Sequence, residues 1–279
     1  MEQKPFLIDL DAVLKSKAPK LTNKLPRFVI NYFKRIIHQD ELNHILTIYA
    51  DKKGVDFMDA CVEYFDLTLN VKGLDKIDKS GRYIFASNHP LGGLDGICLS
   101  SILGNKFDKK IKYVVNDFLY YIENLKPIFL PVNKHGAQSR QAMEESSTAF
   151  NSDNQIITFP AGVCSRRKKE VIKDLQWKKS FIHKAIETER NIVPVYFEAR
   201  NSNFFYKFAN LRELFGIKFN AEMVFLADEM FKNKGRTFTI TFGQPIPYSH
   251  FDKSRSTTEW ASYVKEIAYS LKNITETKS

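Results

Sequence analysis

From residue 68 onward, stretches with the pattern of β-strands alternate with stretches that have the pattern of helices. The strand-like stretches are short, apolar and rich in β-branched or aromatic residues: Tyr83–Ala86, Lys112–Val115, Ile128–Val132, Gln155–Phe159, Ile192–Phe197 and Thr237–Phe242. The helix-like segments cover residues 95–103, 117–125, 137–150, 175–189 and 257–272. This alternation is typical of helices that cross over a sheet between strands. The sequence therefore predicts an α/β fold in which helices flank a mixed, largely parallel sheet.

Residues 24–66 have a helical pattern instead. In the first part of this region, apolar residues recur every three or four positions: Leu25, Phe28, Val29, Tyr32, Phe33, Ile36 and Ile37. Polar and basic residues take the opposite face. Such a helix either covers a domain core or lies in a membrane interface, and covering the core is the commoner role. We predict a helical N-terminal extension, residues 1–67, packed on one α/β domain, residues 68–279.

The net charge of +10 favours anionic partners. Nucleic acid, acidic lipid headgroups, coenzyme A phosphates and an acidic carrier protein all meet this condition. Three basic clusters, at residues 106–112, 166–169 and 178–179, either hold such a partner or are ordinary solvated surface. The sequence contains no zinc finger, RNP block or KH-type motif, so we do not expect it to bind nucleic acid.

The start of the chain lacks the basic and apolar regions of a secretory signal. No stretch approaches the roughly 18 consecutive apolar residues that span a bilayer. The three cysteines are widely spaced, and the histidines show no metal-ligand spacing. These features predict a cytoplasmic protein without a disulfide framework or a bound metal.

The segment SNHPLGGLDG, residues 87–96, carries the strongest chemical signal. A predicted strand runs into Asn88 and His89, and the following proline keeps His89 extended. Gly92 and Gly93 then allow a tight turn, and Asp95 begins the next helical run. Ligands of open α/β sheets bind at such carboxyl ends of strands. A histidine held there beside a carboxylate can act as a general base, with Asp95 fixing its tautomer.

Each of these residues also has a structural explanation. Asp95 is a good helix-capping residue, His89 could be a hydrogen-bonded turn histidine, and the glycines could serve the turn alone. Taken singly, each explanation is at least as good as the catalytic one. Their combination at one strand–helix junction favours catalysis.

Three blocks of the sequence resemble the glycerolipid (lysophosphatidate-type) acyltransferase superfamily. NHPLGGLD resembles its first motif, His, four residues, Asp; FPAGVCSRR (159–167) resembles its F-P-E-G-T-R-S block; and IVPVYFEARNS (192–202) resembles its late proline-containing strand. The order and spacing match over residues 68–245. The first block is most similar to a branch labelled as hemolysins, which includes O-acyltransferases that make ornithine and glycine lipids.

The resemblance implies an O-acyltransferase that moves a fatty acyl group from a thioester to the hydroxyl of a lyso-lipid, with an amino-acid lyso-lipid as the expected acceptor. It implies His89 and Asp95 as catalytic residues. The implied substrate-binding residues are Asn88, Gly92, Gly93, Gly162, Ser165, Arg166 and Arg167. No cofactor is implied; acyl carrier protein or acyl-coenzyme A is the donor. The enzyme would work peripherally on an anionic surface, the inner face of the cell membrane.

The chain departs from the superfamily pattern in two places. Five residues rather than four separate His89 from Asp95, and the Gly92–Gly93 turn could absorb the extra one. The second block also has Ala161, Val163 and Cys164 in place of its glutamate, threonine and arginine. Their loss argues against a glycerol-3-phosphate-type acceptor. Arg166 and Arg167 could instead form a cationic fork for the carboxylate of an amino-acid lipid.

Several alternatives stay open at this stage. The chain could be a non-catalytic lipid- or carrier-binding protein, a 1-acylglycerol-3-phosphate acyltransferase, or a hydrolase whose base activates water. The absence of G-x-S-x-G and of a cysteine–histidine pair argues against an acyl-enzyme, and Cys164 is interpreted as a packing residue. The aromatic residues of the segment 203–215 either line an acyl groove, touch a membrane or pack in the core.

Overall fold

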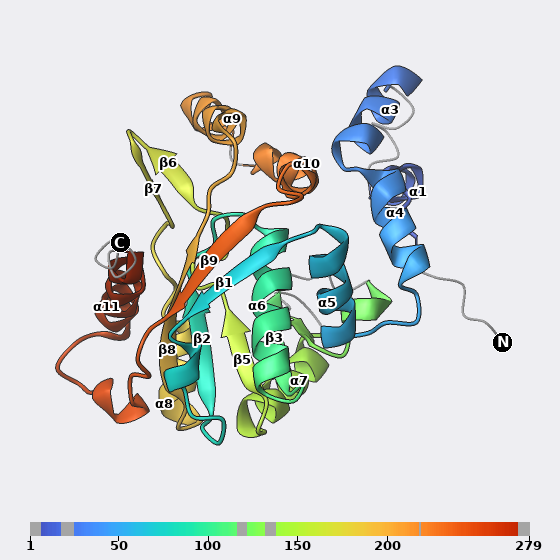
Figure 1. Cartoon of the computed structure of the whole chain (residues 1–279). Coiled ribbons are helices and arrows are strands. Elements are labelled where there is room, and N and C mark those ends of the chain that lie inside the picture. Colours follow the sequence, from blue (N-terminus) through green and yellow to red (C-terminus); the bar gives the residue numbers. More distant parts are fainter. Residues whose placement is uncertain (1–6, 18–24, 116–121, 132–137, 218, 273–279) are drawn as a thin grey trace.

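A central sheet organises the molecule. The computed structural model describes residues 7–17, 25–115, 122–131, 138–217 and 219–272. The strands of the sheet are β1 (Thr68–Lys72), β2 (Tyr83–Ser87), β3 (Ile111–Val115), β4 (Phe129–Pro131), β5 (Gln155–Thr158), β8 (Asn191–Glu198) and β9 (Thr237–Phe242). They lie in the order β1-β9-β8-β2-β5-β3-β4, and among these pairs only β8 and β9 are antiparallel. The predicted mixed, largely parallel α/β sheet is confirmed (Figure 1).

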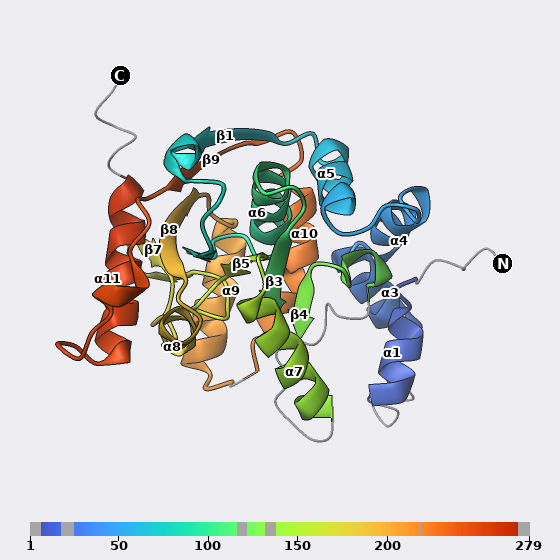
Figure 2. The ribbon, with the colours of Figure 1, turned by 90° about the horizontal axis from the view of Figure 1, so that it is seen from below.

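Helices cover both faces of the sheet. On one face lie α5 (Val55–Tyr64) and α6 (Gly93–Lys106); on the other lie α7 (Gln138–Asn151) and α8 (Ser180–Glu187), with α11 (Thr257–Ser270) beside β8 (Figure 2). Strand β2 is buried throughout, which is why its sequence is apolar at every position but the last. Tyr83 and Phe85 join the core under α5 and α6, whereas Ile84 and Ala86 join the core under α8 and α11. This alternation follows the two-residue period of a strand.

The described part of the N-terminal region contains α1 (Leu10–Lys17), α3 (Arg27–Ile36), α4 (Gln39–Ile48) and α5. The predicted helical stretch 24–66 is therefore broken into three helices. The breaks occur at His38 and at Gly54, whose φ angles are 50° and 58°. Ile45 and Leu46 of α4 belong to the same core as α5 and α6, so α4 and α5 contribute to the core beside the sheet. On α3 itself only Ile30 is buried.

His38 attaches the junction of α3 and α4 to the rest of the molecule. Its Nε2 lies 3.2 Å from an Asp228 carboxylate oxygen. Its ring stacks on Phe231, with 4.3 Å between the ring centroids. Asp228 and Phe231 both lie in α10 (Leu226–Phe231). The N-terminal helices thus contact a segment about 190 residues further along the chain.

Some elements are absent from the sequence-based prediction. They are β1, the antiparallel pair β6 (Arg166–Lys168) and β7 (Val171–Lys173), α9 (Asn203–Leu214), the 3₁₀ helix η4 (Ala221–Phe225) and α10. Shorter 3₁₀ turns are η1 (Leu74–Lys76), η3 (Glu123–Leu125) and η5 (Tyr248–His250). Most of the predicted helix 117–125, and Val132 of a predicted strand, fall outside the described residues. The described end of that predicted helix forms η3.

No helix in the described part of the chain combines the length and apolar character needed to cross a membrane.

Candidate active site

The junction between β2 and α6 holds the predicted base and its carboxylate together. His89 lies two residues beyond the end of β2, and its Nδ1 is 2.8 Å from Oδ2 of Asp95 in the first turn of α6. The extra residue in the spacing is accommodated at Gly92, which precedes α6 with φ 88° and ψ −107°. Residues that have a Cβ rarely adopt this backbone conformation. The longer spacing thus leaves the two side chains in contact.

Asp95 caps its helix and contacts His89 with the same carboxylate. Its Oδ2 accepts hydrogen bonds from the backbone N–H groups of Leu91 and Gly92, both at 3.0 Å. The side chain is completely buried. Burial raises the pKa of Asp95 above its ordinary value, although the contacts with His89 and with the two N–H groups act in the opposite direction. The capping role and the orienting role are therefore compatible.

The imidazole of His89 is held in a defined orientation. Its ring stacks on Phe159 of the second block, with 4.1 Å between centroids and 25° between planes. Nδ1 is buried and lies 2.8 Å from Oδ2 of Asp95 as a close charge contact rather than a well-aligned hydrogen bond, and among the described residues it has no hydrogen-bond partner. A carboxylate beside Nδ1 favours the tautomer with the proton on Nδ1. In that tautomer the lone pair of Nε2 is available to accept a proton.

Backbone contacts bring the three sequence blocks together around His89. Ser165 of the second block donates its N–H to the carbonyl oxygen of His89 at 2.8 Å. Asn201 of the third block donates from Nδ2 to the carbonyl oxygen of Pro90 at 3.0 Å, and its own Oδ1 is buried without a partner among the described residues. These contacts join residues 76 and 111 positions apart in the sequence, and they meet at the end of β2.

Asp174 is a buried residue of this site that the sequence analysis missed. Its Oδ1 accepts the N–H of His89 at 3.2 Å and the hydroxyl of Ser165 at 2.6 Å. Its Oδ2 accepts the indole N–H of Trp177 at 2.8 Å. Asp174 follows β7 at a sequence distance of 85 residues from His89, so no local motif connects them. A lone acid among lysines, followed by a tryptophan, was its only signal in the sequence.

Arg166 and Arg167 do not form the cationic fork that the sequence suggested. Arg166 is buried, and its guanidinium donates to Glu222 at 2.6 Å and to the carbonyl oxygen of Cys164 at 2.8 Å. Arg167 donates to Oδ1 of Asn203 at 2.9 Å. Because neighbouring side chains of a strand leave it on opposite faces, these consecutive β6 residues acquire separate partners.

The remaining predicted binding residues have identifiable structural neighbours. Asn88 is buried, and its side chain exchanges two hydrogen bonds with the backbone of Phe197 in β8, at 3.0 and 2.7 Å. A Cβ on Gly93 would lie 3.5 Å from Sδ of Met230, and one on Gly162 would lie 2.8 Å from Nζ of Lys178. The assignment of these residues to substrate binding remains a prediction.

Comparison with known proteins places this geometry in a family. A protein-family model with the description "Acyltransferase" matches residues 12–278. The chain belongs to the acyltransferase family. It is 52% identical over 266 residues to a lyso-glycine lipid O-acyltransferase of Bacteroides thetaiotaomicron, an alignment that covers 95% of this chain and 98% of the relative. It is 50% identical, also over 266 residues, to a protein of the same name from Phocaeicola vulgatus, with 95% of each chain covered.

Among solved structures, this acyltransferase is similar to the 1-acyl-sn-glycerophosphate acyltransferase PlsC of Thermotoga maritima. The sequence identity is 14% and the TM-score is 0.49. The match covers 80% of this chain and 83% of that one.

Cys164 is buried in this acyltransferase and packs with Phe205 and Tyr206 of α9. A Cβ on Gly92 would lie 3.1 Å from its sulfur, so the thiol lies against the turn at Gly92. Burial raises the pKa of the Cys164 thiol far above its ordinary value, and the nearby Asp95 adds to the effect. The thiol therefore stays protonated, in agreement with its interpretation as a packing residue.

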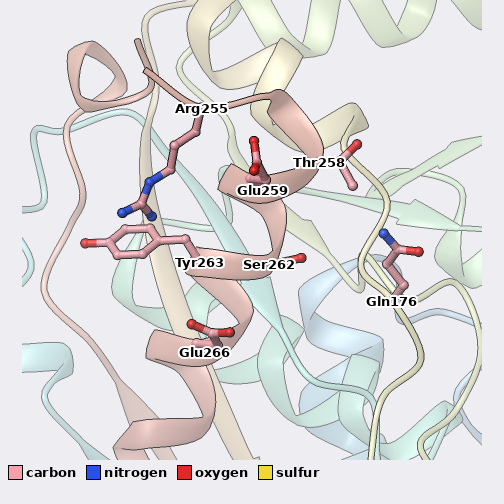
Figure 3. Close-up of a pocket in the computed structure, with 7 residues that line it drawn as sticks. All are labelled: Gln176, Arg255, Thr258, Glu259, Ser262, Tyr263 and Glu266. Carbon is pink, nitrogen blue, oxygen red and sulfur yellow. The ribbon is translucent and has the colours of Figure 1, made fainter. Parts of the chain in front are cut away.

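An open hollow along α11 contains none of the residues described above. It is lined by Gln176, Arg255, Thr258, Glu259, Ser262, Tyr263 and Glu266 (Figure 3). In it the Arg255 guanidinium lies over the Tyr263 ring, 5.1 Å from its centroid. Two carboxylates and one guanidinium make this a polar surface feature of the acyltransferase. Among the described residues, no group of three or more potential metal ligands is present.

Proposed function

We propose that this acyltransferase transfers a fatty acyl group from a thioester to the hydroxyl of an amino-acid lyso-lipid, specifically a lyso-glycine lipid, with His89 as general base. The contact between His89 and Asp95 at the carboxyl end of β2 carries the proposal for the base. The names of two relatives that are 52% and 50% identical over 95% of the chain support the acceptor.

In the proposed reaction, Nε2 of His89 takes the proton of the lyso-lipid hydroxyl as its oxygen attacks the thioester carbonyl. A C–O bond forms and the carbonyl oxygen becomes an oxyanion. When the tetrahedral intermediate collapses, the C–S bond breaks and the imidazolium returns the proton to the departing thiolate. The buried Asp95 carboxylate stabilises the transient imidazolium and holds the ring. No acyl-enzyme is needed, because the hydroxyl attacks the thioester directly.

The amino end of α6 is well placed to help with the oxyanion. Helix N-termini concentrate unpaired N–H groups and a partial positive charge. The Gly92 N–H already donates to Asp95, which leaves the N–H groups of the first turn of α6 as candidates. Removal of one such donor typically costs on the order of 10²–10³ in kcat.

Both proposed donors, acyl carrier protein and acyl-coenzyme A, are anionic, as the net charge of +10 favours. Because the acceptor and the product are lipids, we also propose that the enzyme works peripherally on the cytoplasmic face of the cell membrane.

The test is an acyl-transfer assay with purified enzyme. Acyl carrier protein or coenzyme A loaded with a fatty acid would be supplied with N-(3-hydroxyacyl)glycine, N-(3-hydroxyacyl)ornithine or lysophosphatidate in detergent, and products would be identified by mass spectrometry. We expect transfer to the glycine lipid. His89→Ala should lower its rate by a factor on the order of 10²–10⁴. The matched control is His183→Ala, which removes an exposed histidine of α8 and should leave the rate unchanged.

The outcomes separate the alternatives. Transfer to lysophosphatidate alone would retain the chemistry and overturn the proposed acceptor. Acyl release that needs no acceptor would indicate a hydrolase. Equal rates for the wild type and His89→Ala would overturn the assignment of the base.

A further inference from the structure

Helix α9 has one apolar face in the core and a second one in solvent. Phe205, Tyr206 and Ala209 are buried. At the end of the helix and in the turn that follows, Leu211, Leu214, Phe215, Ile217 and Phe219 are 50%, 81%, 71%, 49% and 71% exposed. We call these five residues the apolar tip. Leu211, Leu214 and Phe215 have the spacing of one helix face. Apolar residues on protein surfaces are normally scattered singly. Exposed clusters of apolar residues instead mark interaction sites.

Buried ion pairs hold the apolar tip in a fixed position. Arg212, which is 8% exposed, donates from Nε to Glu222 at 2.7 Å and also donates to the carbonyl oxygen of Ile217. The other carboxylate oxygen of Glu222 accepts a hydrogen bond from Arg166 of β6 at 2.6 Å. One carboxylate thus joins α9, η4 and β6. Because each of these charges would be costly to bury alone, the turn is strongly held in this geometry.

The segment that follows the apolar tip, from η4 to α10, covers the turn at Gly92 and Gly93 that connects His89 to α6. A Cβ on Gly92 would lie 3.1 Å from Cδ1 of Leu226, and one on Gly93 would lie 3.5 Å from Met230. Phe225 of η4 packs edge-on against Phe204 and Phe208 of α9. Helices α9 and α10 therefore lie at the end of the sheet where β2 delivers His89 (Figure 1). The apolar tip and the catalytic base share this end of the molecule.

The surroundings of the apolar tip favour an anionic partner. Lys207 of α9 is exposed, and so are Lys168 and Lys169 of the β6–β7 hairpin, which contacts α9. The acidic residues Glu170 and Glu213 are also exposed, with Glu213 3.8 Å from Arg212, whereas Glu222 is buried, so the exposed lysines outnumber the exposed acids. Aromatic and aliphatic side chains flanked by lysines suit the interface of an anionic bilayer.

We propose that the apolar tip inserts into the interfacial region of an anionic lipid bilayer, with the adjoining lysines on its headgroups. The site at the end of β2 then opens towards the leaflet from which the acceptor comes. This proposal rests on the proposed function for the direction of acceptor entry, whereas bilayer binding can be measured without any reaction.

The test is flotation of the full chain with vesicles of phosphatidylcholine and phosphatidylglycerol. The triple variant Leu214→Ser, Phe215→Ser, Phe219→Ser should bind at least about tenfold more weakly than the wild type, because three large apolar side chains no longer enter the bilayer. The matched control is Phe28→Ser with Tyr32→Ser, which removes exposed aromatic residues of α3. The control should retain most of the binding.

A fluorescence measurement keeps the test decisive if the triple variant fails to fold. The two native tryptophans, Trp177 and Trp260, are buried, so Phe215→Trp adds an exposed reporter. We expect its emission to shift to the blue on addition of vesicles and to be quenched by brominated lipid. Unchanged emission would overturn the proposal.

Activity distinguishes a failure of this inference from a failure of the proposed function. With acceptor dispersed in detergent, the triple variant should match the wild type; with acceptor in vesicles, it should be slower by at least about tenfold. The proposal that the apolar tip inserts into the bilayer would be refuted if the triple variant bound vesicles as well as the wild type. It would also be refuted if only the α3 control lost binding. Intact vesicle binding with loss of acyl-carrier-protein binding would assign the tip to the carrier instead.

Discussion

At the scale of single residues, the site depends on how His89 is held. Asp95 lies against Nδ1, Phe159 stacks on the ring, and Asp174 and Ser165 bind the backbone N–H and carbonyl groups. The orientation of the imidazole is thus controlled from the side chain and from the main chain. Catalytic groups need such support, because small displacements of a reacting group are costly to the rate.

Asp95→Asn tests the charge of the carboxylate apart from its shape. All the shortest contacts of Asp95 converge on Oδ2, so the amide oxygen of asparagine can replace it. We expect kcat for acyl transfer to fall by a factor on the order of 10²–10⁴, since the imidazolium loses its counter-charge. The free energy of unfolding should stay the same or rise slightly, because burial penalises the charge of Asp95 in the folded protein. A variant with wild-type kcat would contradict this role.

The three cysteines should be unreactive in the folded protein. Burial raises the pKa of Cys61 to about 12 and the pKa values of Cys98 and Cys164 further still, so the thiolate is scarce at neutral pH. We expect maleimide to leave the native chain unlabelled at pH 8 and to leave activity unchanged. In urea, mass spectrometry should count three adducts. Rapid labelling of Cys164 with loss of acyl transfer would reopen an acyl-enzyme route.

At the scale of secondary structure elements, the turn into α6 determines whether the base and the carboxylate meet. The helix begins at Gly93 directly after the unusual backbone of Gly92, and Asp95 is then in its first turn. A shift of this start would rotate Asp95 away, because each residue of a helix turns by 100°. The covering segment from η4 to α10 packs against the same turn through Leu226 and Met230.

Gly92→Ala should therefore be more damaging than an alanine at a comparable glycine elsewhere. The backbone at Gly92 has φ 88°, and the new Cβ would lie 3.1 Å from both Cys164 and Leu226. At Gly216 the φ is 67°, with no atom within 4 Å of a new Cβ. We expect losses of about 2–4 kcal/mol for Gly92→Ala and about 1–2 kcal/mol for Gly216→Ala in urea unfolding. Equal losses would show that the packing around Gly92 relaxes freely.

At the scale of the whole molecule, Arg190 joins parts of the chain that are far apart in sequence. Its guanidinium donates to the carbonyl oxygens of Tyr83, Ala149, Phe150, Ser152 and Asn154. It thereby connects β2, the end of α7 and the start of β8 at the opposite end of β2 from His89. Arg190 is fully buried, and burial, with Arg82 nearby, lowers its pKa to about 10.

Arg190→Lys tests this junction. A lysine ammonium has three donors on a flexible stem and cannot reproduce the planar fork. We expect a loss of roughly 2–4 kcal/mol in the free energy of unfolding, because several carbonyl groups lose charged partners. Arg236→Lys, at an exposed position beside β9, is the control and should change it by less than about 0.5 kcal/mol. Similar values for the two variants would contradict the junction.

Features that depend on neighbouring residues could be predicted from the amino-acid sequence alone. Strand and helix periods are local, so the α/β alternation agrees with the structure, and all six predicted strands match it to within one residue at their described ends. The pairing of His89 with Asp95 was predictable because a strand end, a glycine turn and a helix start follow each other directly. The family resemblance rests on the same contiguous blocks.

Which distant residues meet could be seen only once the chain was folded. Arg166 is 56 residues from Glu222, and Asp174 is 85 residues from His89. Nothing local to Arg166 indicates that its charge is consumed by a buried glutamate, and the predicted fork failed for that reason. The aromatic residues of 203–219 likewise have no period that separates core from surface. Their partners depend on how the chain returns to the sheet, because a contact across many residues is selected by packing of the whole fold.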